Sequence, residues 1–108
     1  MSEQRMMDQI IAEFPYLGNL NDISMDDVAN LLLAEKSYKG SWQRRGGVGA
    51  FMMLARKFDR IEAQVQEYGW DIFEATHKDQ RIEGIIDDIR DLRRYLLLVE
   101  AYIMEKKK

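Results

Sequence analysis

Apolar side chains recur every three or four residues over residues 79–104, and this repeat constrains the fold more than any other feature. The repeat consists of Ile82, Ile85, Ile86, Ile89, Leu92, Leu96, Val99 and Ile103. Such spacing returns once per helical turn and predicts a long amphipathic α-helix with one buried face. Because a single helix cannot cover its own apolar face, the remainder of the chain or a second chain must supply further helices.

Three further helices are expected upstream. The first covers residues 3–14, carries apolar residues at helical spacing and ends at Pro15, because proline disfavours helical geometry in the residue before it. The second begins near Ser24, which stands where an N-cap belongs, and fails near Gly40. The third covers residues 48–68 and ends at Gly69, while residues 70–78 form either a short helix or an ordered loop.

We therefore expect an all-α fold, a four-helix-type bundle that forms a single domain over residues 1–108. A chain of 108 residues buries a modest core, so a homo-oligomer is expected. The chain has no cysteine, which excludes disulfides, thiolate metal ligands and a cysteine nucleophile. It shows no secretory signal and no run of 18 apolar residues, so we expect a cytoplasmic protein without a membrane partner.

Charge is segregated along the chain. Residues 1–35 hold seven acidic residues and one basic residue, a net charge of −6, whereas residues 36–60 hold seven basic residues and one acidic residue, a net charge of +6. A basic excess of this size attracts an anion, unless it pairs with the acidic segments across helix contacts. Double-stranded nucleic acid is not an expected partner, because the whole chain has a net charge of −3.

Glu83, Asp87 and Asp91 form an acidic stripe with a spacing of four residues along the expected last helix. Carboxylates gathered in a groove are the ligands that Mg²⁺ prefers, so these three residues are the candidate metal ligands and Mg²⁺ the candidate cofactor. Two alternatives stay open. Lys57 and Arg60 on the third helix could form salt bridges with Asp87 and Asp91, or the stripe could face solvent.

The segment 36–49 is rich in glycine and basic residues and runs directly into the third helix. Glycines allow close backbone approach to a ligand, and a helix N-terminus attracts anions, so the segment suits a phosphate. The candidate phosphate-binding residues are Lys36, Arg44, Arg45, Lys57 and Arg60, and the candidate base-stacking residues are Tyr38 and Trp42. The alternative is a surface loop whose aromatic residues plug into the core. The segment is not a Walker A motif.

Three blocks of sequence agree in order with a known family. They are Lys36-x-Tyr38-x-Gly40-x-Trp42, then Lys57-x-x-Arg60 followed by Glu62, then Glu83-x₃-Asp87-x₃-Asp91-x₃-Tyr95. Together these blocks resemble the first family of nucleotide-modification-associated domains, small and mostly phage-encoded, over residues 28–103. That family is distantly similar to the all-α nucleoside triphosphate pyrophosphatases, which hold magnesium with helical carboxylates.

The resemblance implies a phage-type protein of nucleotide metabolism that binds a nucleoside phosphate and, with Mg²⁺, hydrolyses it as a pyrophosphohydrolase in the host cytoplasm. The related pyrophosphatases pair an E-x-x-E helix with an E-x-x-D helix, and this sequence has no E-x-x-E motif. Its absence favours binding over hydrolysis. The alternatives are a non-catalytic protein that sequesters a nucleotide and a helical protein-interaction module.

Overall fold

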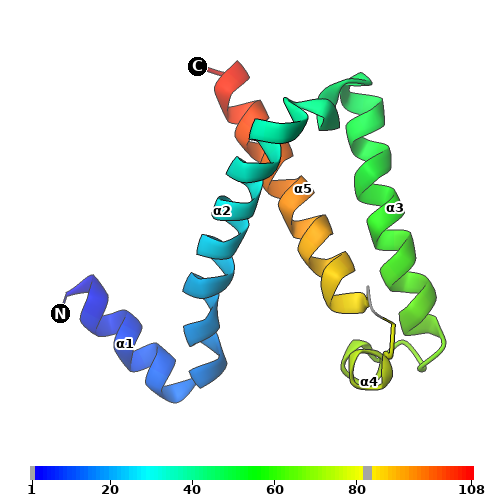
Figure 1. Ribbon diagram of the computed structural model, residues 1–108. Helices are drawn as coiled ribbons and strands as arrows, with labels where there is room; N and C mark the ends of the chain where they lie inside the picture. Colours follow the sequence, from blue (N-terminus) through cyan, green and yellow to red (C-terminus); the bar gives the residue numbers. More distant parts are fainter. Residues whose placement is uncertain (1, 82–83) are drawn as a thin grey trace. The chain divides into compact units, whose positions relative to one another are not determined.

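The computed structural model describes residues 2–81 and 84–108, and these residues contain helices and no strands. The prediction of an all-α protein is therefore confirmed. Contacts divide the chain into two compact units, residues 1–39 and residues 40–108, which are described separately below (Figure 1). No helix in the described part of the chain combines the length and the apolar character that a membrane span requires.

The first unit contains helix α1 (Glu3–Glu13), the 3₁₀ turn η1 (Pro15–Gly18) and helix α2 (Asn19–Tyr38). Ser2 caps α1, because its hydroxyl accepts a hydrogen bond from the backbone N–H of Arg5 at 3.1 Å. The predicted N-cap at Ser24 is wrong. The chain is already helical at Gly18, and α2 follows η1 directly, so Ser24 lies inside the helix. The helix ends at Tyr38, next to Gly40, as predicted.

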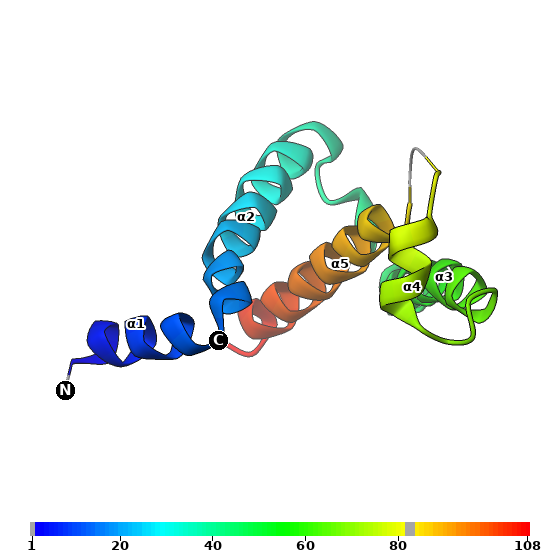
Figure 2. The same ribbon diagram turned by 90° about the horizontal axis from the view of Figure 1, so that it is seen from below.

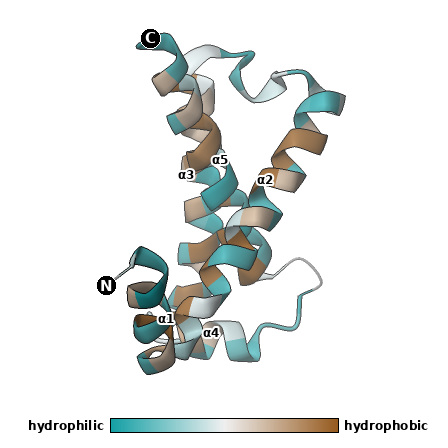
Figure 3. Cartoon of the chain, turned by 90° about the vertical axis from the view of Figure 1, so that its left-hand side faces the viewer, coloured by the Kyte–Doolittle hydropathy of each residue, from teal (hydrophilic) through white to brown (hydrophobic). Residues whose placement is uncertain are grey.

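The first unit buries almost none of its apolar side chains. Asp27 is the buried residue among those described in α1, η1 and α2. On α2 the apolar residues are spread around the helix, whereas on α1, α3 and α5 they gather on one side. Figure 3 shows these hydrophobic residues in brown along α2. A unit with no buried apolar side chain lacks a core of its own.

The second unit contains the 3₁₀ turn η2 (Ser41–Gln43) and helices α3 (Gly46–Gln66), α4 (Ile72–Lys78) and α5 (Ile85–Lys106). Helices α3 and α5 lie side by side, and the short α4 packs against both of them (Figures 1 and 2). Between the three helices lies a small core, which consists of the buried residues Ile61, Val65, Ala75 and Ile85 and of the partly buried Tyr68, Ile72, Ile89 and Leu92.

Helix α3 begins at Gly46, two residues before the predicted start, so three glycines lie in its first turn. Glycine costs little there, because the first backbone N–H groups of a helix have no intrahelical partners to lose. The helix ends at Gln66. Gly69 follows with φ +67°, and the N–H of Trp70 returns to the carbonyl of Val65 at 3.0 Å. This is the termination that Gly69 was predicted to provide.

Helix α5 begins at Ile85, not at the predicted residue 79. The Asp79 carboxylate accepts hydrogen bonds from the Ile85 N–H at 2.6 Å and from the Arg81 side chain, so Asp79 caps α5 from outside it. Hydrogen bonds from Arg81 and then from the Ile85 N–H hold the pKa of Asp79 well below its usual value. Gly84 permits this approach, because a Cβ atom there would stand 2.5 Å from Asp79 Oδ2. The predicted apolar residue Ile82 lies outside the described residues.

Candidate functional site

Two charged residues of α3 face two charged residues of α5. Lys57 Nζ lies 2.9 Å from Asp91 Oδ2, and Arg60 Nε lies 2.9 Å from Asp88 Oδ1. Lys57 precedes Arg60 along α3, whereas the partner of Lys57 follows the partner of Arg60 along α5. The two helices are therefore antiparallel at this point. The sequence left open salt bridges from Lys57 and Arg60 to the acidic stripe, and the structure has this arrangement with Asp88 in place of Asp87.

Asp88 is the most deeply buried member of these pairs, with 2% of its side chain exposed against 37% for Arg60. The N–H at Arg60 Nε is not directed at a carboxylate oxygen, so the contact is an ion pair without a hydrogen bond. Arg81 Nη2 lies 3.8 Å from Asp88 Oδ2 and adds a second positive charge. Asp88 is thus a buried carboxylate held between two guanidinium groups.

The sequence contained a signal for the position of Asp88. It stands three residues after Ile85 and four before Leu92, which places it on the apolar face of α5. Asp87, one position earlier, points away from this face. Its carboxylate contacts Arg90 Nη1 at 3.3 Å, with both side chains nearly half exposed.

The expected metal ligands do not form a metal site in the part of the chain that the structure describes. Asp91 is held by Lys57 and Asp87 by Arg90, while Glu83 lies outside the described residues. No cluster of three or more His, Asp or Glu side chains suited to a metal ion occurs within residues 2–81 and 84–108. The described donors therefore do not fit Mg²⁺, and its binding stays a prediction.

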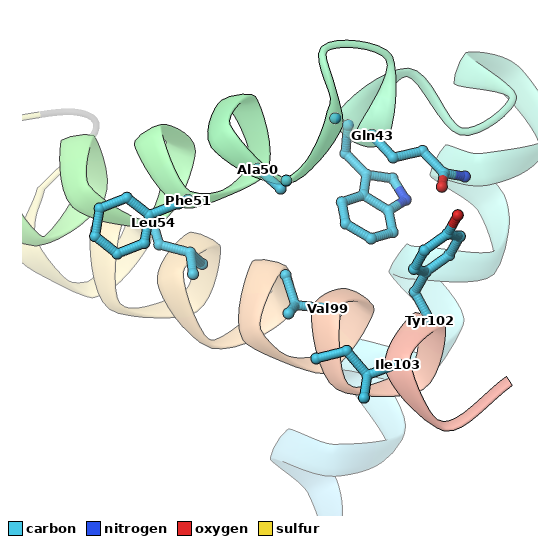
Figure 4. A pocket seen from close by; sticks show the side chains of 10 residues that line it. Gln43, Ala50, Phe51, Leu54, Val99, Tyr102 and Ile103 are labelled. Atoms are coloured by element: carbon cyan, nitrogen blue, oxygen red, sulfur yellow. The ribbon is translucent and has the colours of Figure 1, made fainter. Parts of the chain in front are cut away.

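A cleft opens at the other end of the α3–α5 pair, beside η2. Its volume is about 380 Å³. The lining residues are Trp42, Gln43, Gly46, Gly47, Ala50, Phe51, Leu54, Val99, Tyr102 and Ile103. Side chains of α3 and α5 face each other across the cleft in Figure 4. The cleft is mostly apolar, and Gly46 and Gly47 bring the start of α3 to its edge.

Trp42 and Tyr102 meet edge to face at this cleft, with ring centroids 5.7 Å apart and an interplanar angle of 89°. Lys106 Nζ lies 5.2 Å from the centroid of the Tyr102 ring. Trp42 is half-buried in this contact. Tyr102 was not among the base-stacking residues predicted from the sequence, although it shares a helix face with Leu98 and Tyr95.

The remaining candidate residues belong to different elements of the chain. Arg44 and Arg45 are exposed between η2 and α3, next in sequence to the cleft. Lys57 stands ten residues beyond Gly47, about 15 Å along α3, so Lys57 and Arg60 belong to the ion-paired end and not to the cleft. Lys36 and Tyr38 lie in the last turn of α2, in the first unit, and both are exposed.

Comparisons with known proteins add no relative: no protein-family model matches the chain, and no curated protein or solved structure does so. On the geometry described above, the candidate site consists of two parts, the ion-paired end of the α3–α5 pair and the aromatic cleft beside η2.

Proposed function

We propose that the protein binds a nucleoside phosphate at the cleft between the start of α3 and the last turns of α5. The observation that carries this proposal is an apolar cleft with an aromatic pair at the positively charged end of a helix. Trp42 and Tyr102 offer ring surfaces to a base, while Gly46 and Gly47 allow a phosphate to approach the backbone N–H groups of α3.

Two arginines strengthen the proposal. Arg44 and Arg45 are exposed and stand directly before Gly46 in the chain, so their side chains can reach a phosphate held at the start of α3. Lys57 and Arg60, by contrast, are neutralised by Asp91 and Asp88. In this proposal they stabilise the helix pair, and the phosphate contacts come from the arginines before α3.

The proposed activity is binding, as in a protein that sequesters a nucleotide in the setting of phage nucleotide metabolism. Magnesium-dependent hydrolysis is the catalytic version of the same hypothesis. It requires the carboxylates of α5 to leave their ion pairs with lysine and arginine side chains and to bind a metal instead. The proposed assembly is a helical bundle completed by a homo-oligomer, in the host cytoplasm.

Isothermal titration with a panel of ribo- and deoxynucleoside mono-, di- and triphosphates tests the proposal, in EDTA and in Mg²⁺. We expect binding in both buffers, and at least a tenfold loss of affinity for Arg44→Ala/Arg45→Ala. The matched control Lys78→Ala/Arg90→Ala removes two positive charges of the second unit away from the cleft and should leave the affinity unchanged. Binding only with Mg²⁺, together with product formation by chromatography, would favour the hydrolase; no binding of any nucleotide would refute both versions.

A second candidate function, a helical protein-interaction module, is favoured by the ion pairs and by the exposed apolar side chains of every helix. It requires no nucleotide affinity. In this case Lys57→Ala/Arg60→Ala should destabilise the fold. Neither the wild-type chain nor the Arg44→Ala/Arg45→Ala variant should bind a nucleotide. The same titrations, together with thermal unfolding of the two double variants, separate this candidate from the first.

A further inference from the structure

Gln43 places a side-chain amide at the cleft beside η2. It lies in the last position of this turn, and its side chain is half-buried. A glutamine amide carries two N–H donors and a carbonyl acceptor with two lone pairs. Within the described residues the Gln43 amide makes no hydrogen bond, so its donors and its acceptor are available to a molecule in the cleft.

The turn at η2 restrains this amide. The backbone N–H of Gln43 donates to the carbonyl of Gly40 at 3.2 Å, which closes the turn. Gly40 has φ +74°, and a Cβ atom there would stand 3.0 Å from the amide nitrogen of Gln43. The side chain thus packs against a position where glycine leaves room for it. Both residues belong to the second unit. A restrained amide loses less conformational freedom when it binds a ligand.

The polar groups of the cleft gather at one end. In Figure 4 the Gln43 amide and the Tyr102 hydroxyl are directed to the η2 end, while Phe51 and Leu54 lie farther along α3. Tyr102 also meets the Trp42 ring edge to face. An aromatic pair with an amide beside it suits a flat ring that carries hydrogen-bonding groups on its edge. A nucleobase is such a ring.

We propose that Gln43 selects the base and that the site prefers adenine. This inference rests on the proposed binding of a nucleoside phosphate at the same cleft. Adenine carries the N6 amino donor next to the N7 acceptor, and a glutamine amide pairs with both groups at once. Guanine carries two acceptors, O6 and N7, at the same edge, and these match the paired donors of an arginine instead.

The other described residues that line the cleft fit this choice. They include no arginine or lysine, which would match the guanine edge, and no aspartate or glutamate, which would accept a hydrogen bond from the cytosine amino group. A pyrimidine has a single ring and covers less of the aromatic pair than a purine does, so burial of ring surface favours a purine. Adenine therefore matches both the amide and the aromatic pair.

Isothermal titration in EDTA with the triphosphates of adenosine, guanosine, cytidine and uridine tests the preference. The wild-type chain should bind the adenosine compound at least fivefold more tightly than the other three. Gln43→Leu keeps a side chain of similar size without hydrogen-bonding groups. It should lose at least fivefold in affinity for adenosine triphosphate and less than twofold for the others. The matched control Gln66→Leu makes the same change at the exposed end of α3 and should leave all four affinities unchanged.

Two analogues test the pairing on the wild-type chain, so the result does not depend on a variant that folds. The triphosphate of 7-deazaadenosine lacks the N7 acceptor, and that of purine riboside lacks the N6 amino group. Both should bind the wild-type chain more weakly than adenosine triphosphate, whereas Gln43→Leu should bind all three equally, because it lacks the amide that contacts these atoms. If Gln43 only supported the turn, its replacement would weaken all nucleotides by the same factor.

The outcomes separate this inference from the proposed function. If the wild-type chain binds no nucleotide, the proposed function is refuted and the preference for adenine is refuted with it. Three results would overturn the preference alone and leave nucleotide binding standing: equal affinity for the four bases, an equal loss for all of them in Gln43→Leu, or full affinity of the wild-type chain for both analogues.

Discussion

Replacement of Asp88 by asparagine should destabilise the protein far more than the same replacement of Asp91, although both carboxylates contact a cation of α3 at 2.9 Å. The Asp88 side chain is 2% exposed and the Asp91 side chain 43%. Asp88→Asn removes the negative charge that faces Arg60 and Arg81, while Asp91→Asn removes a charge that water already screens. The difference therefore tests burial as the cause.

The magnitudes follow from these environments. Removing one partner of a fully buried pair costs about 3–5 kcal/mol, but Arg60 is 37% exposed and regains part of its hydration, so we expect about 2–3 kcal/mol for Asp88→Asn. Exposed pairs contribute about 0–1 kcal/mol, which is the range expected for Asp91→Asn. With about 4–8 °C per kcal/mol for a domain of this size, the Tm should fall by roughly 10–20 °C for Asp88→Asn and by less than about 8 °C for Asp91→Asn.

Urea unfolding followed by circular dichroism, at one fixed protein concentration, measures both free energies of unfolding. The concentration is fixed because dimerisation would also raise the apparent stability. Equal losses for the two variants would refute the argument from burial, and so would a stable Asp88→Asn variant. The Arg90→Ala variant, which removes the exposed partner of Asp87, serves as a control and should change the stability by less than about 1 kcal/mol.

The connection before α5 yields two further predictions. Gly84→Ala should lower the free energy of unfolding by about 1–3 kcal/mol, because the new Cβ would meet Asp79 Oδ2. At Gly47 a new Cβ would have no atom within 4 Å, so Gly47→Ala should be neutral or slightly stabilising. Urea unfolding of both variants checks this pair. The lowered pKa of Asp79 means that its stabilising contribution is present above its unfolded pKa of about 3.9 and is lost as pH falls toward the lower pKa of the folded state. Acid unfolding of Asp79→Asn should therefore show a weaker pH dependence below about pH 4 than the wild-type chain, and identical acid profiles would contradict this role.

Helical periodicity was sufficient to predict α3 and α5, because each has one apolar face with a clear repeat. For residues 70–78 it left a short helix and a loop open, and the structure has the short helix α4. The predicted ends were less accurate where local geometry decides them. Ser24 has the right side chain for an N-cap, but the 3₁₀ turn at Pro15 starts the helix earlier. Asp79 also resembles the first residue of a helix, yet it caps α5 across a connection that sequence spacing does not reveal.

The candidate site was only partly predictable for a similar reason. The pairing of Lys57 with Asp91 follows from two facing helices, and the sequence had left such pairing open. Adjacent residues of a helix point about 100° apart, so Asp88 lies on the apolar face of α5 while Asp87 points away from it. This difference decides that Arg60 pairs with Asp88. The contact of Trp42 with Tyr102 joins residues 60 positions apart, so only the three-dimensional packing of α3 on α5 reveals it.

The opposed ion pairs of α3 and α5 also limit how this protein can change in length. Inserting one residue between Asp88 and Asp91 would turn one carboxylate by about 100° and shift it by about 1.5 Å relative to the other. Lys57 and Arg60 could then no longer meet both partners, so insertions and deletions should be rejected within this stretch of α5.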